Sequence, residues 1–277
     1  MTSYNREMYI SEAIESVLLS TYPHFELIIT DDCSKDRTVK IAKSYAAKDS
    51  RIKIYINEKN LGDYANRNRA ASYAVGDWLM SVDSDDRIDA DGIEKVLECM
   101  NQFPNSDFGM RYFTGDDLME VDSATAIRKH LLKSPFLATG PGGTIIRRAF
   151  FNKINGYPEK YGPANDMYFN LKATSQSSIV LIPFDFHFYR RHDGQEINNW
   201  VSYMYNFYNY FKDAINELNL YITDAEKKWL IHKNDRRFLV KMVNLALKKR
   251  QVSKTFEISK KAHFGLSQII SALFYIK

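Results

Sequence analysis

Strand-like and helix-like apolar patterns alternate along the first hundred residues of this chain. Residues 25–30 and 78–82 are short apolar runs of strand length, and residues 52–56 alternate between apolar and polar side chains. Between and after these runs, apolar residues recur at the spacing of one helical face, as in residues 93–100. Strands that alternate with helices predict an α/β protein with a Rossmann-like, mostly parallel central sheet and helices on both faces.

The alternation begins with a helix instead of a strand. Apolar residues between Ile10 and Leu18 share one helical face, whereas residues 1–5 are typical of a loop that follows a strand. A parallel sheet of this kind needs a strand before its first helix, so we expect the first strand to be missing, either because the start is assigned too late or because the chain is truncated. A version extended upstream by about six apolar residues, the usual strand length, should then be more stable.

Composition indicates a globular protein with one large core. The chain has 277 residues, of which 45% are hydrophobic. Its cysteines, Cys33 and Cys99, are too few for a disulfide framework, and we expect both to be reduced in an intracellular protein. The sequence shows neither a signal-peptide pattern nor an apolar run of about 18 residues, so we expect neither secretion nor a membrane-spanning helix.

Positive charge is concentrated near the end of the chain. Residues 223–277 hold thirteen Lys and Arg against four Asp and Glu, although the net charge is only +4. We expect residues 201–277 to form a helical, basic C-terminal extension, whose apolar and basic faces suit peripheral contact with an anionic membrane. A solvated charged surface is the alternative. No nucleic-acid-binding motif accompanies the charge, so no nucleic acid partner is expected.

An acidic run follows one of the predicted strands directly. Residues 78–82 end in Asp-Ser-Asp-Asp at positions 83–86, and ligands of open α/β sheets bind beyond the carboxyl ends of strands. Asp83 and Asp85 would point to the same side, and their oxygens suit Mg²⁺ or Mn²⁺. These residues predict a divalent metal that carries a phosphorylated substrate. A solvated turn is the alternative, whereas a calcium loop is excluded because Ile88 stands where it needs Gly.

Several motifs occur in one order over about the first 200 residues. They are Thr2–Glu7, Tyr22–Ser34, Asn60–Gly62, Arg67 with Asn68, Asp83–Asp86, Asn165 with Asp166, and Tyr189–His192. In combination they resemble family 2 glycosyltransferases, which have the GT-A fold. The resemblance implies a GT-A domain over residues 1–200, with a nucleotide-sugar-binding half at 1–100 and an acceptor-side half at 101–200.

The resemblance also implies a donor-binding role for matching residues. The implied nucleotide-sugar-binding positions are Thr2, Tyr4, Asn5, Asp32, Arg67, Asp83, Ser84 and Asp85. Thr2 and Tyr4 would line the base pocket, with Tyr4 against the uracil face, and Asp32 would accept a hydrogen bond from the base. Arg67 would lie near the nucleotide or its diphosphate, and Asp83 would contact the ribose.

Metal and base positions follow from the same resemblance. Asp85 would hold Mn²⁺ or Mg²⁺ against the diphosphate, with His192 as a further ligand. Asp166 would remove the proton of the acceptor hydroxyl, and the family pattern has Glu where this chain has Asn165. A metal that stabilises the leaving diphosphate and a base that removes a proton are what direct, inverting sugar transfer requires.

Each of these residues also has a simpler interpretation when taken singly. Asp32 and Asp166 could each cap a helix, and Arg67 and His192 could be ordinary surface residues. The loop at 140–143 lacks the ending of a P-loop, so it either shapes the acceptor pocket or is only a turn.

Taken together, the residues and the resemblance predict an inverting, metal-dependent glycosyltransferase. The expected donor is a UDP-sugar, and the expected acceptor is a hydroxyl of a glycan or lipid-linked saccharide in cell-surface polysaccharide synthesis. The expected location is cytoplasmic, with peripheral contact at the inner face of the plasma membrane. The alternative is a catalytically inactive nucleotide-sugar- or glycan-binding module derived from such an enzyme.

Overall fold

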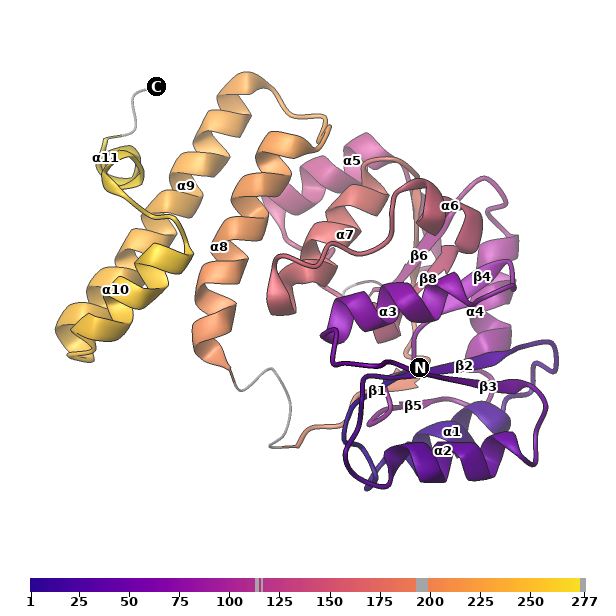
Figure 1. Cartoon of the computed structure of the whole chain (residues 1–277). Helices are drawn as coiled ribbons and strands as arrows, with labels where there is room; N and C mark the ends of the chain where they lie inside the picture. The colour runs from indigo at the N-terminus through magenta and orange to yellow at the C-terminus, as the bar shows by residue number, and fades with distance from the viewer. Residues whose placement is uncertain (113–114, 116, 193–198, 275–277) are drawn as a thin grey trace.

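A computed structural model describes residues 1–112, 115, 117–192 and 199–274. Helices and strands alternate through the first hundred residues, and a second group of strands and helices follows (Figure 1). Helices of the last 75 or so described residues stand to one side of the rest (Figure 1). The predicted α/β class is therefore confirmed.

The first sheet is parallel throughout. In spatial order its strands are β1 (Thr2–Ser3), β2 (Leu27–Asp31) and β3 (Ile52–Ile56). Helices α1 (Ile10–Leu18) and α2 (Thr38–Ala46) cover one face, and α3 (Asp63–Ser72) lies on the other (Figure 1). Every residue of β2 is buried, as expected of a strand that is covered on both faces. Helices on both faces of a parallel sheet are thus confirmed here.

The prediction that the first strand is missing needs correction. Thr2 and Ser3 pair in parallel with Thr30 and Asp31 of β2 and so form a short strand, where the sequence analysis placed a loop. Two residues give too little apolar pattern to indicate a strand, and the pairing is instead visible only through backbone hydrogen bonds. One example is the bond from the Thr30 N–H to the Met1 carbonyl oxygen, at 3.0 Å.

The second sheet is mixed. In spatial order its strands are β4 (Trp78–Met80), β8 (Thr144–Arg147), β6 (Phe108–Arg111), β9 (Ile179–Ile182) and β7 (Met119–Val121). β6 runs parallel to β9, whereas β8 runs antiparallel to both β4 and β6, and β7 antiparallel to β9. A further antiparallel pair joins β5 (Arg87–Ile88) to β10 (His187–Phe188) and brings the segment after β10 beside the acidic run.

The main core lies between this second sheet and its helices. Those helices are α4 (Gly92–Asn101), α5 (Ser123–Arg128), a π-helix (Lys129–Lys133), α6 (Arg148–Lys153) and α7 (Asn165–Thr174). Phe108 of β6 and Phe169 of α7 are fully buried and meet edge to face, with ring centroids 6.2 Å apart. Because α7 is buried on most sides, its first turn is held firmly at the edge of the sheet.

The C-terminal segment is helical, as predicted. Its helices are α8 (Trp200–Glu217), α9 (Asp224–Val243), a π-helix (Asn244–Lys248), α10 (Val252–Lys261) and α11 (Leu266–Leu273). Phe207 and Phe211 of α8 pack on the main core, while Tyr208 packs with Phe238 of α9. A capping box of Thr223 and Glu226 starts α9. Among the described residues, no helix is long and apolar enough to cross a membrane.

Candidate active site

A polar cleft of about 880 Å³ lies beyond the carboxyl ends of β1, β2 and β4. The start of α3, the loop at 138–142 and the start of α7 close its other sides. The predicted site residues that line it are Thr2, Tyr4, Asp32, Arg67, Asp83, Ser84, Asp85 and Asp166. Residues from both halves of the sequence therefore converge on one cavity, as a two-substrate site requires.

Asp83 is held by a buried cation. Arg67 projects from α3 with only 8% of its side chain exposed, and its Nη2 lies 2.7 Å from the Asp83 Oδ1. The Arg67 Nε lies 2.9 Å from the Asp63 Oδ1, so two carboxylates share one guanidinium. Burial raises the pKa of Asp83, but Arg67 outweighs it and holds that pKa below its usual value. Arg67 is therefore part of the site and not a solvated surface residue.

Asp85 meets two nitrogen atoms at one carboxylate oxygen. Its Oδ2 lies 2.9 Å from the Arg6 Nε and 2.9 Å from the His192 Nε2. His192 is 13% exposed and stacks on Tyr9, with ring centroids 4.8 Å apart, so it is not an ordinary surface histidine. The sequence placed Asp85 and His192 at the metal, and the structure brings these two side chains together.

The pair of Asp85 and His192 suits a divalent cation. A carboxylate supplies hard oxygen donors and an imidazole supplies a softer nitrogen donor, and Mg²⁺ commonly takes only one or two protein ligands beside substrate phosphates and water. Among the residues that the structure describes, no group of three or more His, Cys, Asp or Glu side chains could hold a metal. These two side chains offer two donors, so a metal held here would need further ligands from water or a bound substrate.

Asp86 fixes the segment that carries His192. Its Oδ1 accepts a hydrogen bond from the Arg190 N–H at 2.9 Å, and the Arg190 Nε donates to the Asp85 carbonyl oxygen at 2.8 Å. Burial raises the pKa of the Asp86 carboxyl to about 7. The acidic run and the segment after β10 are therefore joined by two hydrogen bonds, each between a side chain and the backbone.

Asp32 and Asn5 hold the loops around the cleft. The Asp32 carboxylate is almost fully buried and accepts hydrogen bonds from the Leu61 and Gly62 N–H groups at 2.8 and 2.9 Å. It therefore caps the turn before α3 and not the helix near Thr38. Asn5 accepts from the Lys35 N–H at 2.8 Å and does not line the cleft, whereas Tyr4 is 45% exposed there.

Asp166 stands in the first turn of α7 and faces the cleft from the other side. Its Oδ1 accepts a hydrogen bond from the Met167 N–H at 2.7 Å. A Cβ added to Gly140 would lie 3.8 Å from the Asp166 Oδ2, so the 138–142 loop passes close to this carboxyl. Burial raises the pKa of Asp166 to about 7, which is near that of an efficient general base.

Several residues of the site were not predicted from the sequence. Three charged residues contact the acidic run or Arg67, namely Arg6, Asp63 and Arg190. Two aromatic residues of α8 line the wall of the cleft, namely Tyr203 and Phe207. Arg6 lies in the Thr2–Glu7 motif, so its position was a usable signal. Nothing in the pattern of α8 distinguishes an aromatic residue that lines a cleft from one that packs in the core.

Fold and site together define an α/β protein with a polar, acidic cleft at the carboxyl ends of its strands. The model of the family described as "Glycosyl transferase family 2" matches residues 1–158, which is more than half of the chain. The chain therefore belongs to glycosyl transferase family 2, as its motifs predicted.

Three curated relatives are similar over parts of the chain. The putative teichuronic acid biosynthesis glycosyltransferase TuaG of Bacillus subtilis is 41% identical over 43% of this chain and 46% of its own length. An uncharacterized glycosyltransferase of Haemophilus influenzae is 41% identical over 64% of this chain and 62% of its own length. The poly(ribitol-phosphate) beta-N-acetylglucosaminyltransferase TarS of Staphylococcus aureus is 27% identical over 83% of this chain and 42% of its own length. The chain thus spans less than two thirds of each relative.

Two solved structures share the fold. S. aureus TarS 1-349 in complex with UDP superposes with a TM-score of 0.71 at 23% identity, over 98% of this chain and 79% of that one. The mannosyltransferase PcManGT of Pyrobaculum calidifontis, in complex with GDP-Man and Mn²⁺, superposes with a TM-score of 0.67 at 14% identity, over 95% of this chain and 85% of that one. This likeness confirms the predicted GT-A fold.

Proposed function

We propose that this chain is an inverting, metal-dependent glycosyltransferase that moves a sugar from a UDP-sugar to an acceptor hydroxyl. One observation carries the proposal. The same cleft holds an acidic run paired with Arg67, Arg6 and His192 on one side and a carboxyl that titrates near neutrality, Asp166, on the other. The first group suits a donor diphosphate, and the second suits an acceptor.

On the donor side, Asp85 and His192 would hold Mn²⁺ or Mg²⁺. When bound, the metal would act as a Lewis acid that stabilises the charge of the departing diphosphate. Arg67 keeps Asp83 ionised, so that Asp83 can accept a hydrogen bond from a ribose hydroxyl. Tyr4 has an exposed ring at the opening of the cleft and would stack on the base.

On the acceptor side, Asp166 would take the proton of the attacking hydroxyl. Its Oδ1 accepts from the Met167 N–H, and its Oδ2 faces Gly140 in the cleft wall. The acceptor oxygen would bond to the anomeric carbon as the bond from that carbon to the diphosphate breaks on the opposite face. One displacement inverts the anomeric configuration, and no second nucleophile is needed.

The names of similar proteins support the donor and acceptor classes. TarS has been solved with UDP and with UDP-GlcNAc, and the names of TuaG and TarS refer to teichuronic acid and poly(ribitol-phosphate). We therefore propose a glycan or lipid-linked saccharide acceptor in cell-surface polysaccharide synthesis, and a cytoplasmic location.

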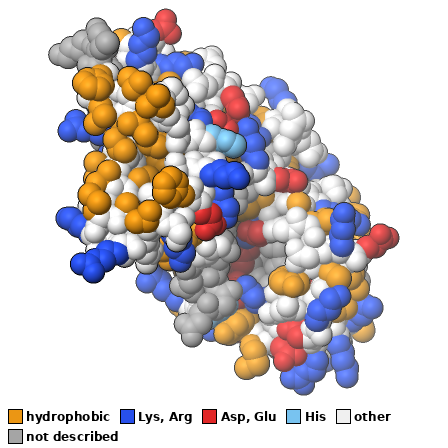
Figure 2. Space-filling model, turned by 60° about the vertical axis from the view of Figure 1, so that its left-hand side comes forward, with side chains coloured by type: hydrophobic (Ala, Val, Ile, Leu, Met, Phe, Trp, Pro, Cys, Tyr) orange, Lys and Arg blue, Asp and Glu red, His pale blue; other side chains and the backbone are white. Residues whose placement is uncertain are grey.

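The C-terminal helices suit peripheral membrane contact. Apolar side chains gather on this part of the surface, with Lys and Arg around them (Figure 2). Between residues 224 and 273 the exposed large apolar residues are Val240, Val243, Leu247, Val252, Phe256, Leu266, Ile270 and Leu273. Exposed basic neighbours in the sequence are Lys241, Lys248, Lys249, Arg250 and Lys254. An apolar surface with a basic border is complementary to an anionic bilayer.

A flotation assay tests that contact. We expect the chain to float with vesicles that contain phosphatidylserine and to float less with neutral vesicles, because both charge and apolar area contribute. The double variant Leu266→Glu with Leu273→Glu should lose flotation, whereas Val75→Glu, at a site 69% exposed on another part of the molecule, should not. Absence of flotation with the anionic vesicles would remove the proposal.

Donor turnover tests the enzymatic proposal. We expect the protein with Mn²⁺ to release UDP from one member of a panel of UDP-sugars, and Asp85→Ala to abolish the release. Asp89→Ala changes an exposed carboxylate four residues away and should leave the release unchanged. Nucleotide-sugar binding without turnover, with every acceptor tried, would favour the inactive binding module instead.

A further inference from the structure

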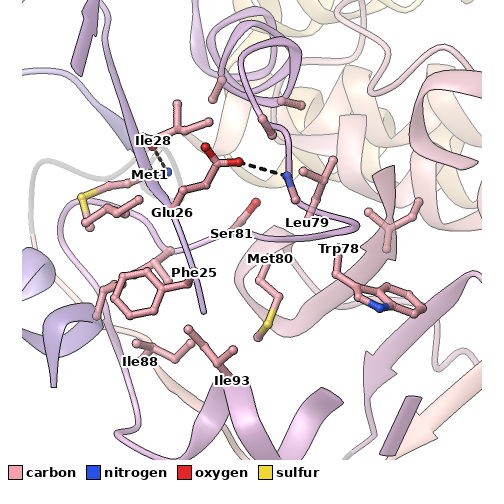
Figure 3. A pocket seen from close by; sticks show the side chains of 18 of the residues that line it. Met1, Phe25, Glu26, Ile28, Trp78, Leu79, Met80, Ser81, Ile88 and Ile93 are labelled. Carbon is pink, nitrogen blue, oxygen red and sulfur yellow. Dashed lines mark hydrogen bonds between the residues drawn. The ribbon is translucent and has the colours of Figure 1, made fainter. Parts of the chain in front are cut away.

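Two further cavities in the described structure differ in the charges that line them. One, of about 410 Å³, lies between β2 and β4 and is lined by charges of both signs. Its Glu26 already has partners, because the Oε1 accepts hydrogen bonds from the Val75 and Gly76 N–H groups at 2.7 and 3.0 Å (Figure 3). The other, of about 1250 Å³, lies along α8 and α9 beside the π-helix at 129–133, and we call it the helical groove.

The helical groove adjoins the candidate active site. Ala138, Met167 and Phe207 line both the groove and the polar cleft. Met167 directly follows Asp166, whose Oδ1 accepts a hydrogen bond from the Met167 N–H at 2.7 Å. An acceptor whose hydroxyl lies beside Asp166 therefore has the groove as a direct continuation for the rest of its length.

Positive charge follows one side of the helical groove. Lys233, Arg237 and Lys241 line it from α9 at intervals of four residues, so they lie in one row along that helix. The row is about 12 Å long at the usual helical rise. Lys133 and Arg236 add two more cations. Within the described residues, no Asp or Glu side chain lines the groove.

An acidic residue on the same stretch of α9 does not balance this charge. Asp235 is 2% exposed, and its Oδ1 accepts a hydrogen bond from the Tyr208 hydroxyl at 2.7 Å, so its carboxylate is bound in the interior. Burial and the positive charge of Arg237 both lower the pKa of Lys233. The cations of the groove therefore repel one another, and a bound anion would relieve that repulsion.

Aromatic rings lie among these cations. Trp229 and Phe211 line the helical groove and are half-buried. The Lys233 Nζ lies 4.3 Å from the centre of the Trp229 ring. The apolar face of an aromatic ring can pack against the C–H groups of a sugar ring. Rings and cations together are therefore complementary to a chain that carries both sugar rings and negative charges.

His130 fixes the wall of the groove that follows the π-helix. Its Nδ1 accepts hydrogen bonds from the Phe136 and Leu137 N–H groups at 3.1 and 2.9 Å. Burial lowers the pKa of His130 to about 4, so the ring is neutral at neutral pH and keeps both bonds. The segment from Lys133 to Ala138, which contributes to the lining, is therefore held in one shape.

We propose that the helical groove binds an acidic saccharide, namely the part of the acceptor that extends from the hydroxyl beside Asp166. Its negative groups, carboxylates or phosphodiesters, would pair with the row of cations on α9, and its sugar rings would pack on Trp229. This assignment rests on the proposed function, because it names the class of acceptor for the same site.

Saccharide binding in the absence of donor and metal tests the proposal. Three fluorescein-labelled chains are compared by fluorescence anisotropy: oligogalacturonate with carboxylates, a glycerol-phosphate oligomer with phosphodiesters, and neutral maltohexaose. We expect one or both acidic chains to bind at least about tenfold more tightly than maltohexaose. That binding should weaken as NaCl rises from about 50 to about 300 mM, because salt screens the ion pairs. The acidic chain that binds more tightly identifies the anionic group.

Charge reversal locates the binding. Arg236→Glu with Arg237→Glu replaces two exposed side chains of the helical groove and should weaken binding of the acidic chain at least about tenfold. Lys40→Glu with Lys43→Glu makes the same change of charge at exposed positions of α2 and should leave the affinity within about twofold. Both double variants should keep Tm within about 3 °C of the unmodified protein, because all four side chains are exposed.

Several results would overturn the proposal. They are equal affinity for maltohexaose and the acidic chains, no binding of either acidic chain, and unchanged affinity in the Arg236 and Arg237 variant. If that variant loses flotation with anionic vesicles while the unmodified protein binds no acidic saccharide, the cations serve anionic lipid instead. Release of UDP from the donor is measured separately, so a failure of the groove and a failure of the proposed activity are distinguishable.

Discussion

Asp83 and Asp166 line the same cleft in opposite electrostatic surroundings. Burial disfavours the ionised form of both, yet Arg67, at 2.7 Å, holds the pKa of Asp83 below its usual value. Asp166 has no cation at such a distance in the described part of the chain, and burial raises its pKa to about 7. One carboxylate is thus fixed as an anion, while the other can exchange a proton near neutral pH.

Replacing Asp166, the carboxyl that can exchange a proton near neutral pH, should have the largest effect on activity. Asp166→Asn keeps the shape but removes the base, so we expect the rate of sugar transfer to fall about 100- to 10,000-fold. UDP binding, measured by calorimetry, should be unchanged. Asp122→Asn changes an exposed carboxylate at the start of α5 and is the matched control. Transfer by Asp166→Asn at near wild-type rate would contradict the assignment.

Replacing Arg67 tests how much its ion pairs, above all the one with Asp83, contribute to stability. Arg67→Met would leave Asp83 partly buried without its partner, so we expect the free energy of unfolding in urea to fall by about 3–5 kcal/mol. Arg69→Met, on the exposed face of the same helix, should change it by less than about 0.5 kcal/mol. Equal losses in the two variants would mean that the Arg67 pairs are not an important source of stability.

The pH dependence of the reaction tests the pKa of Asp166. The base must be ionised, so below pH 7 the value of kcat/KM should fall about tenfold per pH unit and above it should level off. The free energy of unfolding should change with pH in the opposite direction and fall as pH rises from about 4 to 7. The reason is that the Asp166 carboxyl keeps its proton in the folded state up to about pH 7, whereas in the unfolded state it releases that proton near pH 4. Wild-type Tm should therefore fall relative to that of Asp166→Asn as pH rises from about 4 to 7. An activity plateau that extends to pH 5 would argue against this pKa.

The smallest expected effect is that of Asp63→Asn, which compares the contributions of the two carboxylate partners of Arg67 to stability. The Asp63 side chain is 54% exposed, against 25% for Asp83, so Asp63→Asn should cost less than about 1 kcal/mol in urea unfolding. Asp83→Asn should cost more. A larger loss for Asp63→Asn would reverse the order of the two ion pairs.

Local patterns predicted the parts of the fold that depend on neighbouring residues. The alternation of short apolar runs and helical faces correctly indicated β2, β3 and the helices around them. The acidic run after the predicted strand at 78–82 was correctly placed at the edge of the sheet, because strand ends and ligand sites coincide in α/β folds.

Long-range pairing accounts for what the sequence did not reveal. β1 is only two residues long, and it is a strand because of its bonds to β2, 28 residues away. β6, β8 and β9 are four residues each, and their mixed order depends on partners far along the chain. The contact between Arg6 and Asp85 joins residues 79 apart, so the motif that contains Arg6 could mark it as a site residue but could not indicate its partner.

Calorimetry of UDP binding tests the central claim most directly. If Asp85 and His192 hold a metal against a diphosphate, UDP should bind tightly with Mn²⁺ and at least tenfold more weakly after chelation, and Asp85→Ala should abolish the difference. Equal UDP affinity with and without Mn²⁺ in the unmodified protein would contradict the account.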